Sequence, residues 1–322
     1  MNEDIKEIRI ISPAGSFSNP ENTFKDAINT LEKETQYKVT FGSNSGVVNK
    51  YGTSSITERI DDLHDAYEDS NVAVIIAMSG GYSSNDLLPY VDWDIIKKNQ
   101  KPLIGSSDLT VLINAIYTKT GSSTFYGPNF FKYGMHKGLE YTLLYFKKAL
   151  ISDEDYFIEP SDLWSDDKWY LDQINRDFKK NTGFVICNEG EAEGTIIGGH
   201  LSSLNLLQGT EYMPPFKKTI LCIEEDTLDY QCYGEFKRNI QSLLQATDTS
   251  EIKGILIGRF LTASKMGKED IIHLVKSIEK ISNIPIIANV DFGHTDPSVS
   301  FPIGGKLCIK CDEKNATIQV IK

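Results

Sequence analysis

Short apolar runs alternate with amphipathic stretches through the first half of the chain. Apolar runs of strand length followed by helical spacing are typical of βαβ units, in which helices cover a parallel sheet. The predicted strands are residues 8–11, 38–41, 72–78 and 103–104, and the predicted helices are residues 24–31, 55–67 and 109–119. The uninterrupted apolar run over residues 72–78 indicates a central strand that is buried on both faces.

An acidic and polar segment, residues 151–182, interrupts this alternation. We expect it to connect two domains, so that residues 1–150 form the first domain and residues 183–322 the second. The strands predicted in the second domain are residues 184–187, 220–223, 254–257, 284–288, 307–311 and 317–321, the last two forming a hairpin. We also expect a turn over residues 189–194, a hinge at Gly198 and Gly199, and helices over residues 201–207 and 271–281.

Composition and charge exclude several classes of protein. The chain has 322 residues, of which 40% are hydrophobic and 24% charged, as in an ordinary globular protein. A formal net charge of −12 disfavours binding to nucleic-acid polymers and to anionic membrane surfaces. No apolar run is long enough for a membrane span, and the first residues lack the apolar core of a signal peptide, so we expect a cytoplasmic protein.

The five cysteines do not form a recognisable disulfide pattern. Cys187, Cys222 and Cys308 lie in apolar, strand-like runs, where a reduced thiol packs as a small hydrophobic group. Cys308 and Cys311 have CxxC spacing, but no second pair and no nearby His completes the four ligands of a zinc site. We therefore expect no disulfide, no metal and no cofactor.

Polar residues that directly follow predicted strands are the candidates for function, because ligands of open α/β sheets bind beyond the carboxyl ends of the strands. Ser107 follows the strand at residues 103–104 on a sharp turn into a helix. Backbone N–H groups and the helix dipole at such a turn favour a developing oxyanion, so Ser107 is a candidate nucleophile. The same position is also the usual place of a helix N-cap, and spacing alone favours that simpler role.

Three further candidates follow other strand runs. The Gly80–Gly81 turn can present a free backbone N–H to an oxyanion, although it can equally be a plain strand-to-helix turn. Glu224 begins an acidic cluster that could simply be solvated, and His294 lies in a loop that could hold an ordinary polar His. Together with Ser107, these residues would supply a nucleophile, a base and a carboxylate.

Five sequence blocks resemble the LD-carboxypeptidase family of serine peptidases and occur in the same order. They are residues 80–89, 104–110, 194–199, 220–225 and 292–294, which span nearly the whole chain. Residues 160–172 and 204–214 are similar to the branch of microcin C self-immunity proteins. The resemblance implies a Rossmann-like N-terminal domain and a β-rich C-terminal domain, with the active site in the cleft between them, and it implies a homodimer.

The resemblance also implies roles for individual residues. It makes Ser107 the nucleophile, His294 the general base and Glu224 the carboxylate that orients His294. The backbone N–H groups of Gly81 and Asp108 would form the oxyanion hole.

Three more residues are expected to contact the substrate. His200 stands where the family commonly has Asn, and this difference could alter substrate contacts. Trp164 and Trp169 offer flat aromatic faces on which a nucleobase could stack, although either could instead anchor the connecting segment. A second departure is Ser106, which leaves a smaller side chain beside the nucleophile than the Tyr common in the family.

The function implied by the resemblance is that of a serine carboxypeptidase-like amidase. Its substrate would be a small molecule, a peptidyl or aminoacyl nucleotide of the microcin C kind, and cleavage would confer self-immunity or detoxification. A murein tetrapeptide LD-carboxypeptidase of cell-wall recycling would use the same three residues and is an alternative. A non-catalytic two-domain ligand-binding protein is a third alternative, but it would not need Ser107, Glu224 and His294 together.

Overall fold

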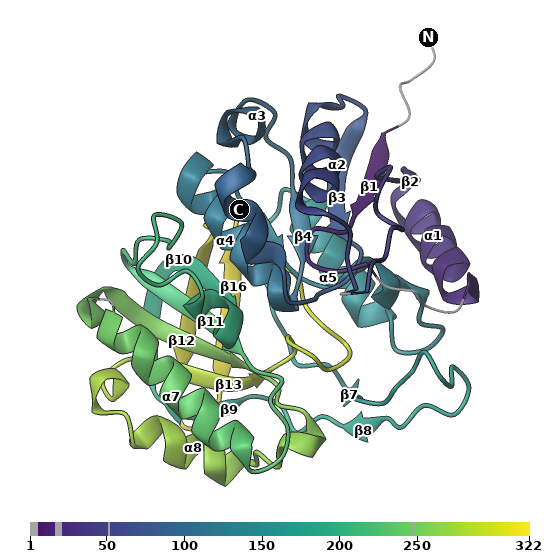
Figure 1. Cartoon of the computed structure of the whole chain (residues 1–322). Helices are drawn as coiled ribbons and strands as arrows, with labels where there is room; N and C mark the ends of the chain where they lie inside the picture. Colours follow the sequence, from purple (N-terminus) through teal and green to yellow (C-terminus); the bar gives the residue numbers. More distant parts are fainter. Residues whose placement is uncertain (1–5, 17–20, 51, 247) are drawn as a thin grey trace.

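The computed structural model describes residues 6–16, 21–50, 52–246 and 248–322, and Figure 1 shows its helices and strands. Two sheets form its framework: a six-stranded sheet built mainly by the first half of the chain and an eight-stranded sheet built by the second half. The protein is therefore an α/β protein with a Rossmann-like N-terminal part and a β-rich C-terminal part, which confirms the predicted fold class.

The six-stranded sheet has the order β14-β5-β4-β3-β1-β2. Its strands are β1 (Glu7–Ile11), β2 (Lys38–Phe41), β3 (Val72–Ala77), β4 (Leu103–Gly105), β5 (Thr124–Tyr126) and β14 (Phe301–Ile303). The pairings among β1 to β5 are parallel, and β14 joins β5 antiparallel. Because β14 comes from near the end of the sequence, the second half of the chain completes the sheet of the first half.

Helices cover both faces of the six-stranded sheet. They are α1 (Glu21–Thr35), α2 (Ile56–Glu68), α3 (Trp93–Lys98), α4 (Thr110–Thr120) and α5 (Glu140–Leu150). Successive residues of a strand point to opposite faces. In β3, Ile76 packs in a cluster with Leu31 of α1 and Phe146 of α5, whereas Ile75 packs in the cluster that includes Leu63 of α2 and residues of α4.

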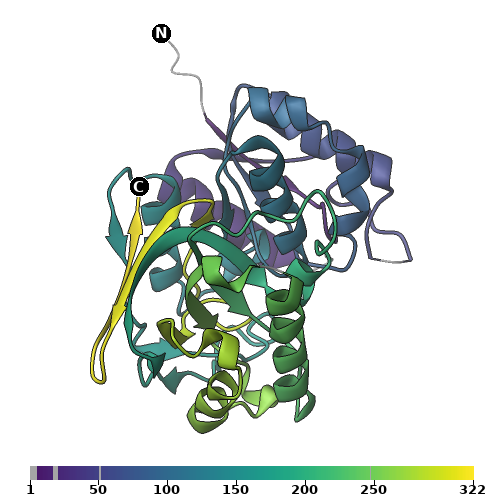
Figure 2. The same ribbon diagram turned by 90° about the vertical axis from the view of Figure 1, so that its left-hand side faces the viewer.

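The eight-stranded sheet has the order β6-β16-β15-β10-β11-β12-β13-β9. Its strands are β6 (Tyr156–Phe157), β9 (Val185–Asn188), β10 (Gly190–His200), β11 (Thr219–Glu224), β12 (Ile252–Gly258), β13 (Ile286–Val290), β15 (Lys306–Cys311) and β16 (Ala316–Ile321). The pairings from β10 to β13 are parallel and the others are antiparallel. Figure 2 shows the β15–β16 hairpin in yellow, with its tip projecting from the rest of the protein.

Three helices accompany this second sheet: α6 (Leu201–Asn205), α7 (Gln231–Ala246) and α8 (Lys268–Lys276). Buried residues of β10 to β13, α7 and α8 belong to the same hydrophobic cluster as those of α2 and α4. One continuous core therefore joins the two sheets, and their side chains are packed together where they meet.

Most predicted elements are confirmed to within one or two residues. The start predicted for the second helix is a capping box, in which the Ser55 hydroxyl accepts from Glu58 N–H and the Glu58 carboxylate accepts from Ser55 N–H. The helix predicted over residues 109–119 is α4, which ends at Gly121, whose φ of +75° is the left-handed conformation that glycine adopts readily. The closing hairpin is also confirmed.

The turn predicted over residues 189–194 and the hinge predicted at Gly198 and Gly199 are wrong, because residues 190–200 form the continuous strand β10 and only Glu189 separates it from β9. Glycine is required here for close packing. A Cβ added at Gly198 would collide with the carbonyl oxygen of Cys222 on β11, and one added at Gly199 would lie 2.5 Å from Thr110 Oγ1 on α4. A strand glycine can mark such a close approach as well as a turn.

The helix predicted over residues 271–281 is only partly correct. The α-helix begins earlier and ends at Lys276, and a separate 3₁₀ turn, Glu279–Ile281, follows it. Ile278 and Ile281 are buried, so the helical spacing of apolar residues continues beyond the end of the helix itself. Helices α3, α5 and α7 have no counterpart among the predicted elements.

The connecting segment is not separate from the two sheets. Its β6 pairs with β16 of the eight-stranded sheet, and its β7 (Leu163–Trp164) and β8 (Lys179–Lys180) form a two-stranded sheet of their own. The division into domains at residues 151–182 stays a prediction.

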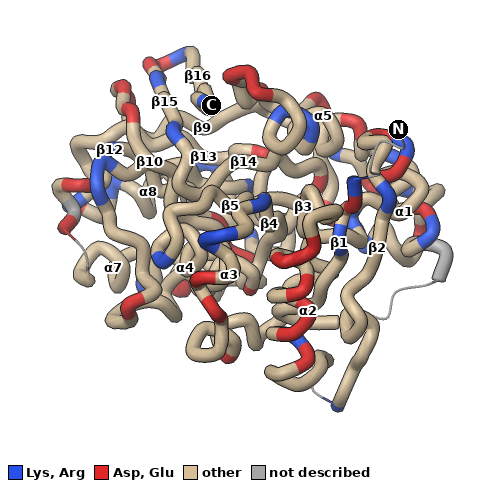
Figure 3. The backbone as a smooth tube through the Cα atoms, turned by 90° about the horizontal axis from the view of Figure 1, so that it is seen from above, with Lys and Arg blue, Asp and Glu red and all other residues tan. Residues whose placement is uncertain are grey.

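Charged residues are spread over the protein. Figure 3 shows Lys and Arg interspersed with Asp and Glu, with acidic positions gathered along α2. None of the helices in the described part of the chain is both long and apolar enough to cross a bilayer. The five cysteines are free.

Candidate active site

Ser107 lies on a strained turn between β4 and α4. The turn is a 3₁₀ turn, η2 (Ser107–Leu109), and Ser107 has a φ of +60°. A non-glycine residue with positive φ is uncommon and costs free energy, so the surrounding structure must hold it there. The Ser107 hydroxyl does not cap the helix: its Oγ lies 3.2 Å from His294 Nε2. The geometry therefore favours the candidate nucleophile over the helix cap.

His294 lies between Ser107 and Glu224. Its Nδ1 is 2.8 Å from Glu224 Oε2, on the opposite side of the ring from the Ser107 hydroxyl. Glu224 is the last residue of β11 and is 1% exposed, whereas the His294 side chain is 26% exposed. The structure thus brings the three predicted residues into one hydrogen-bonded chain, although 187 positions separate Ser107 from His294.

Two glycines allow the approach of His294 to Glu224. Gly293 has a φ of +113°, and a Cβ added there would lie 2.9 Å from Glu224 Oε2. A Cβ added at Gly258, at the end of β12, would lie 2.7 Å from Glu224 Cβ. A larger residue at either position would have to displace the carboxylate.

Tyr126 is a member of the site that sequence analysis missed. Its hydroxyl donates to Glu224 Oε1 at 2.7 Å, so both oxygens of the carboxylate are engaged. Tyr126 is fully buried at the end of β5, stacked on Phe301 and edge-on to Phe292. The short apolar run Thr124–Tyr126 has the appearance of an ordinary core strand, so no sequence signal identifies this tyrosine as functional.

The electrostatics suit a carboxylate paired with an imidazole. Burial opposes the charged form of Glu224, but the charge and hydrogen bond of His294, together with the Tyr126 hydroxyl, lower the pKa of Glu224 below its ordinary value. Burial likewise opposes protonation of His294, but Glu224 and then Asp226 raise the pKa of His294 above its ordinary value. Glu224 is therefore ionised, and it stabilises a proton taken up by the imidazole.

The two predicted oxyanion-hole residues lie on loops that are tied together. The Ser84 backbone N–H donates to Asp108 Oδ2 at 2.8 Å, and the Ser84 hydroxyl donates to the Asp108 carbonyl at 2.6 Å. A Cβ added at Gly80 would lie 2.8 Å from Ser107 Cβ, and one added at Gly81 would lie 2.5 Å from the Ala14 carbonyl. The glycine turn therefore packs directly against the nucleophile turn.

The two tryptophans have different environments. Trp169 is 2% exposed, packs with Met135 and Leu139, and stacks on Phe131 with ring centroids 5.8 Å apart. This burial favours the anchoring role for Trp169.

Trp164 is only partly buried and lies close to the loop that carries His294. Its ring lies within 5 Å of Lys179 Nζ and Arg259 Cζ, at 4.8 and 4.9 Å. The next residue, Ser165, forms two backbone hydrogen bonds with Asp296, in the loop that carries His294. Trp164 is therefore the better placed of the two to contact a ligand at His294.

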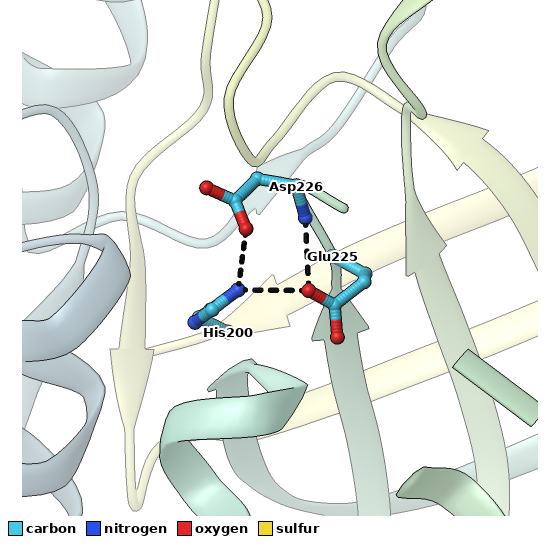
Figure 4. Close-up of side chains that lie close together, drawn as sticks. All are labelled: His200, Glu225 and Asp226. Carbon is cyan, nitrogen blue, oxygen red and sulfur yellow. Dashed lines mark hydrogen bonds and ion pairs between the residues drawn. The ribbon is translucent and has the colours of Figure 1, made fainter. Parts of the chain in front are cut away.

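His200 lies at the end of β10, next to the three catalytic candidates. Figure 4 shows its ring between two carboxylates: Nε2 is 3.1 Å from Glu225 Oε1 and 3.2 Å from Asp226 Oδ1. Although burial opposes protonation, the two carboxylates raise the pKa of His200 to about 11. A protonated His200 forms ion pairs with both carboxylates. The same three side chains lie close enough together to hold an ion.

The geometry can support nucleophilic catalysis. A hydroxyl, an imidazole and a buried carboxylate are arranged so that the imidazole can take the hydroxyl proton while the carboxylate stabilises the resulting charge. The glycine turn packs against this hydroxyl, since a Cβ added at Gly80 would lie 3.0 Å from Ser107 Oγ and 3.8 Å from Asp108 N.

Comparison with known families identifies both halves of the chain. Residues 8–127 match the family described as LD-carboxypeptidase N-terminal domain, and residues 193–309 match LD-carboxypeptidase C-terminal domain. The two matches leave the connecting segment between them.

Three relatives illustrate the range of names in this group. YocD of Bacillus subtilis (strain 168), named as a carboxypeptidase, is 45% identical over 316 residues, which cover 98% of this chain and 97% of YocD. The microcin C7 self-immunity protein MccF of Escherichia coli is 30% identical over 307 residues, covering 92% of this chain and 88% of MccF. A Bacillus subtilis protein named as a murein peptide carboxypeptidase is 26% identical over 325 residues, covering 97% and 91%.

Solved structures have the same fold. An MccF-like protein from Bacillus anthracis superimposes with a TM-score of 0.97 at 45% identity, covering 99% of this chain and 97% of that one. MccF in complex with aspartyl sulfamoyl adenosine superimposes with a TM-score of 0.87 at 28% identity, covering 98% and 96%.

Proposed function

Because this chain belongs to the LD-carboxypeptidase family of serine peptidases, and is thus a hydrolase, we propose that it cleaves an amide or acyl bond with Ser107, His294 and Glu224. The observation that carries this proposal is the hydrogen-bonded chain from Ser107 Oγ through His294 to Glu224. A protein that only binds a ligand would not need this chain.

The proposed reaction follows from the geometry. His294 Nε2 takes the proton of the Ser107 hydroxyl as Oγ attacks the carbonyl carbon. Glu224, held by Tyr126, keeps the proton on Nδ1 and stabilises the imidazolium. His294 then gives its proton to the leaving nitrogen, and an acyl group remains on Ser107. Water, activated by His294 in the same way, releases the acid and regenerates the hydroxyl.

The oxyanion of each tetrahedral intermediate is assigned to the backbone N–H groups of Gly81 and Asp108. The hydrogen bonds between Ser84 and Asp108 support this assignment, since they fix the two loops relative to each other before a substrate binds. Donors that are already in place need no rearrangement as charge develops, which is how such groups lower the barrier.

The proposed substrate is a peptidyl or aminoacyl nucleotide of the microcin C kind, cleaved for self-immunity or detoxification. Support comes from MccF, which has been solved with aspartyl sulfamoyl adenosine, and from the lower identity of the murein carboxypeptidase relative, at 26%. Trp164 is the proposed stacking partner of the base because it is partly exposed and the next residue, Ser165, pairs with Asp296 in the loop that carries His294. We place the reaction in the cytoplasm. The homodimer stays a prediction.

The test is a direct comparison of two substrates. Purified protein is incubated with aspartyl or glutamyl sulfamoyl adenosine and, separately, with a murein tetrapeptide, and the products are identified by mass spectrometry. We expect cleavage of the sulfamoyl adenosine and none by the Ser107→Ala variant. Cleavage of the tetrapeptide alone would instead assign the enzyme to cell-wall recycling. Binding without cleavage of either compound would favour the ligand-binding alternative.

A further inference from the structure

His200 makes an unusually large set of contacts for a residue outside the proposed catalytic chain. Its Nδ1 lies 2.8 Å from Ser203 Oγ, and its Nε2 lies between Glu225 and Asp226. Its own backbone N–H donates to Thr110 Oγ1 at 2.9 Å. With the side chain only 11% exposed and both ring nitrogens engaged, His200 cannot turn to meet a substrate without breaking this network.

Asp226 links His200 to the catalytic imidazole. One of its oxygens, Oδ1, is 3.2 Å from His200 Nε2, and the other, Oδ2, is 3.5 Å from His294 Nε2. The second distance places a carboxylate beside the same nitrogen that must accept the Ser107 proton. The two histidine rings are themselves close, with centroids 5.5 Å apart at an angle of 68°.

We propose that His200 is a positioning residue, which ties Asp226 and Glu225 in place beside His294 and whose positive charge offsets these carboxylates at the catalytic imidazole. The proposal rests on the function proposed above, in which His294 is the base. Its physical basis is charge balance: Glu224 and Asp226 both stabilise the protonated form of His294, and a protonated imidazole cannot take the hydroxyl proton.

The charged groups around His294 come from several elements. Glu224 and Asp226 lie at and just beyond the end of β11, His200 lies at the end of β10, and the neutral Ser107 hydroxyl comes from η2. Within the His294 loop itself, the acids are paired with cations: Asp296 with Lys132 at 2.5 Å and Asp291 with Arg259 at 2.5 Å. His200 is the cation that faces the acids following β11.

The directions of the pKa shifts agree with this arrangement. Glu224 and Asp226 raise the pKa of His294, and His200 lowers it. The hydrogen bond from His200 is the largest cause that lowers the pKa of Asp226, to about 2, so Asp226 stays ionised over the working range. The charge of His200 and the charge of Asp226 therefore act on His294 in opposite directions.

Opposite charges predict opposite shifts in the pH dependence of activity, which a merely structural role would not produce. The acid limb of kcat/KM reports the pKa of the base in the free enzyme. His200→Gln removes the positive charge, so the midpoint of this limb should move up. The size of the shift is about 0.5 to 2 pH units, from Coulomb's law for two charges 5.5 Å apart, the distance between the His200 and His294 rings, with an effective dielectric constant between about 80 and 20. Asp226→Asn should move it down by roughly 1 pH unit, since Asp226 is half exposed and screened by water.

Two control variants make the test specific. His200→Lys keeps the positive charge and should leave the midpoint within about 0.3 pH units of the wild-type value, because the charge is what the proposal requires. Asp229→Asn makes the same change as Asp226→Asn three residues away, at a carboxylate that pairs with Lys265 instead, and should leave the midpoint unchanged. If His200→Gln fails to fold, His200→Asn removes the same charge with a smaller amide side chain and takes its place.

A second measurement separates this proposal from the function on which it rests. The chain has five histidines, so the ring signal of His294 can be followed by NMR and assigned by its loss in His294→Ala. Its titration midpoint should shift in the same two directions whether or not any substrate is cleaved. Opposite shifts without turnover would leave the inference standing and refute the proposed function. Midpoints that stay constant, or that move in the same direction in His200→Gln and Asp226→Asn, would overturn the inference itself.

Discussion

Removal of the Tyr126 hydroxyl tests whether its hydrogen bond to Glu224 supports the proposed catalytic residues. Tyr126→Phe deletes one oxygen and leaves the ring stacked on Phe301 at 5.3 Å. What is lost is the 2.7 Å hydrogen bond to Glu224, a carboxylate that is 1% exposed. Hydrogen bonds to charged groups contribute about 1.5 to 3 kcal/mol, and a buried charge left short of a donor is costly. We therefore expect the free energy of unfolding to fall by about 1.5 to 3 kcal/mol at neutral pH.

The loss should depend on pH with a defined sign. The pKa of Glu224 is lowered in the folded protein, so its contribution to stability is present above the unfolded value near 4.5 and is lost as the pH falls through the lowered one. The Tyr126 hydrogen bond is one cause of that lowering. The difference in stability between wild type and Tyr126→Phe should therefore shrink as the pH is lowered below about 4.

The assay is urea unfolding at several pH values, with Tyr133→Phe as the matched control. Tyr133 is also fully buried, but its hydroxyl has no hydrogen-bond partner in the described part of the chain, so its loss should change stability by less than about 0.5 kcal/mol. We also expect kcat/KM of Tyr126→Phe to fall about 10-fold to 100-fold, since about 1.4 kcal/mol corresponds to tenfold in rate. Equal effects of the two substitutions would refute the argument that Tyr126 supports Glu224.

Four further predictions concern the remaining parts of the site. Ser107→Ala should abolish turnover while the melting temperature stays near the wild-type value, because only one partly buried hydroxyl is lost and no core volume; measurable turnover would remove Ser107 from the mechanism. The acid limb of kcat/KM should lie above pH 6.5, because the neighbouring carboxylates raise the pKa of His294; a pH-rate profile with a lower midpoint would contradict this. Gly80→Ala should reduce kcat/KM about 100-fold, because the new Cβ would lie 2.8 Å from Ser107 Cβ and displace the nucleophile. A normal rate would show that the glycine turn can move away without displacing Ser107. Trp164→Ala should raise KM for an aminoacyl sulfamoyl adenosine by roughly 5-fold to 150-fold, equivalent to about 1 to 3 kcal/mol of lost stacking. Trp169→Ala should chiefly lower the melting temperature, because Trp169 is buried, and the reverse result for the two variants would exchange their roles.

Ser107, Glu224 and His294 could be named as candidates from sequence because each follows an apolar run, but their catalytic roles came from the resemblance to LD-carboxypeptidases. Ser107 and Glu224 come directly after or at the end of parallel strands, where open α/β sheets place their ligands. Tyr126 could not be found in this way, because a tyrosine at the end of a short apolar strand looks the same whether its hydroxyl is used or not. The contact between Tyr126 and Glu224 joins residues 98 positions apart and depends on how the two sheets meet.

The errors along the chain have equally specific causes. The glycines of β10 resemble a turn in sequence, but they are required because neighbouring backbone and side chains approach too closely for a Cβ. Helix α7 did carry a usable signal: its buried residues, Cys232, Phe236, Ile240, Leu243 and Leu244, have helical spacing. Gly234 and the polar residues between them weaken that signal in sequence.

The position of Gly198 and Gly199 also bears on whether the two sheets can move relative to each other. Both glycines lie under α4, where Asn114 Nδ2 donates to the Gly198 carbonyl at 2.8 Å and Thr110 Oγ1 accepts from His200 N–H. A hinge needs exposed backbone that can change its dihedral angles, whereas these residues are buried in a core shared by both sheets. Since Ser107 comes from one sheet and Glu224 from the other, this packing holds the distance between the nucleophile and the carboxylate that orients the base. The proposed mechanism therefore depends on a rigid junction between the sheets, and substitutions that loosen it should reduce activity before they unfold the protein.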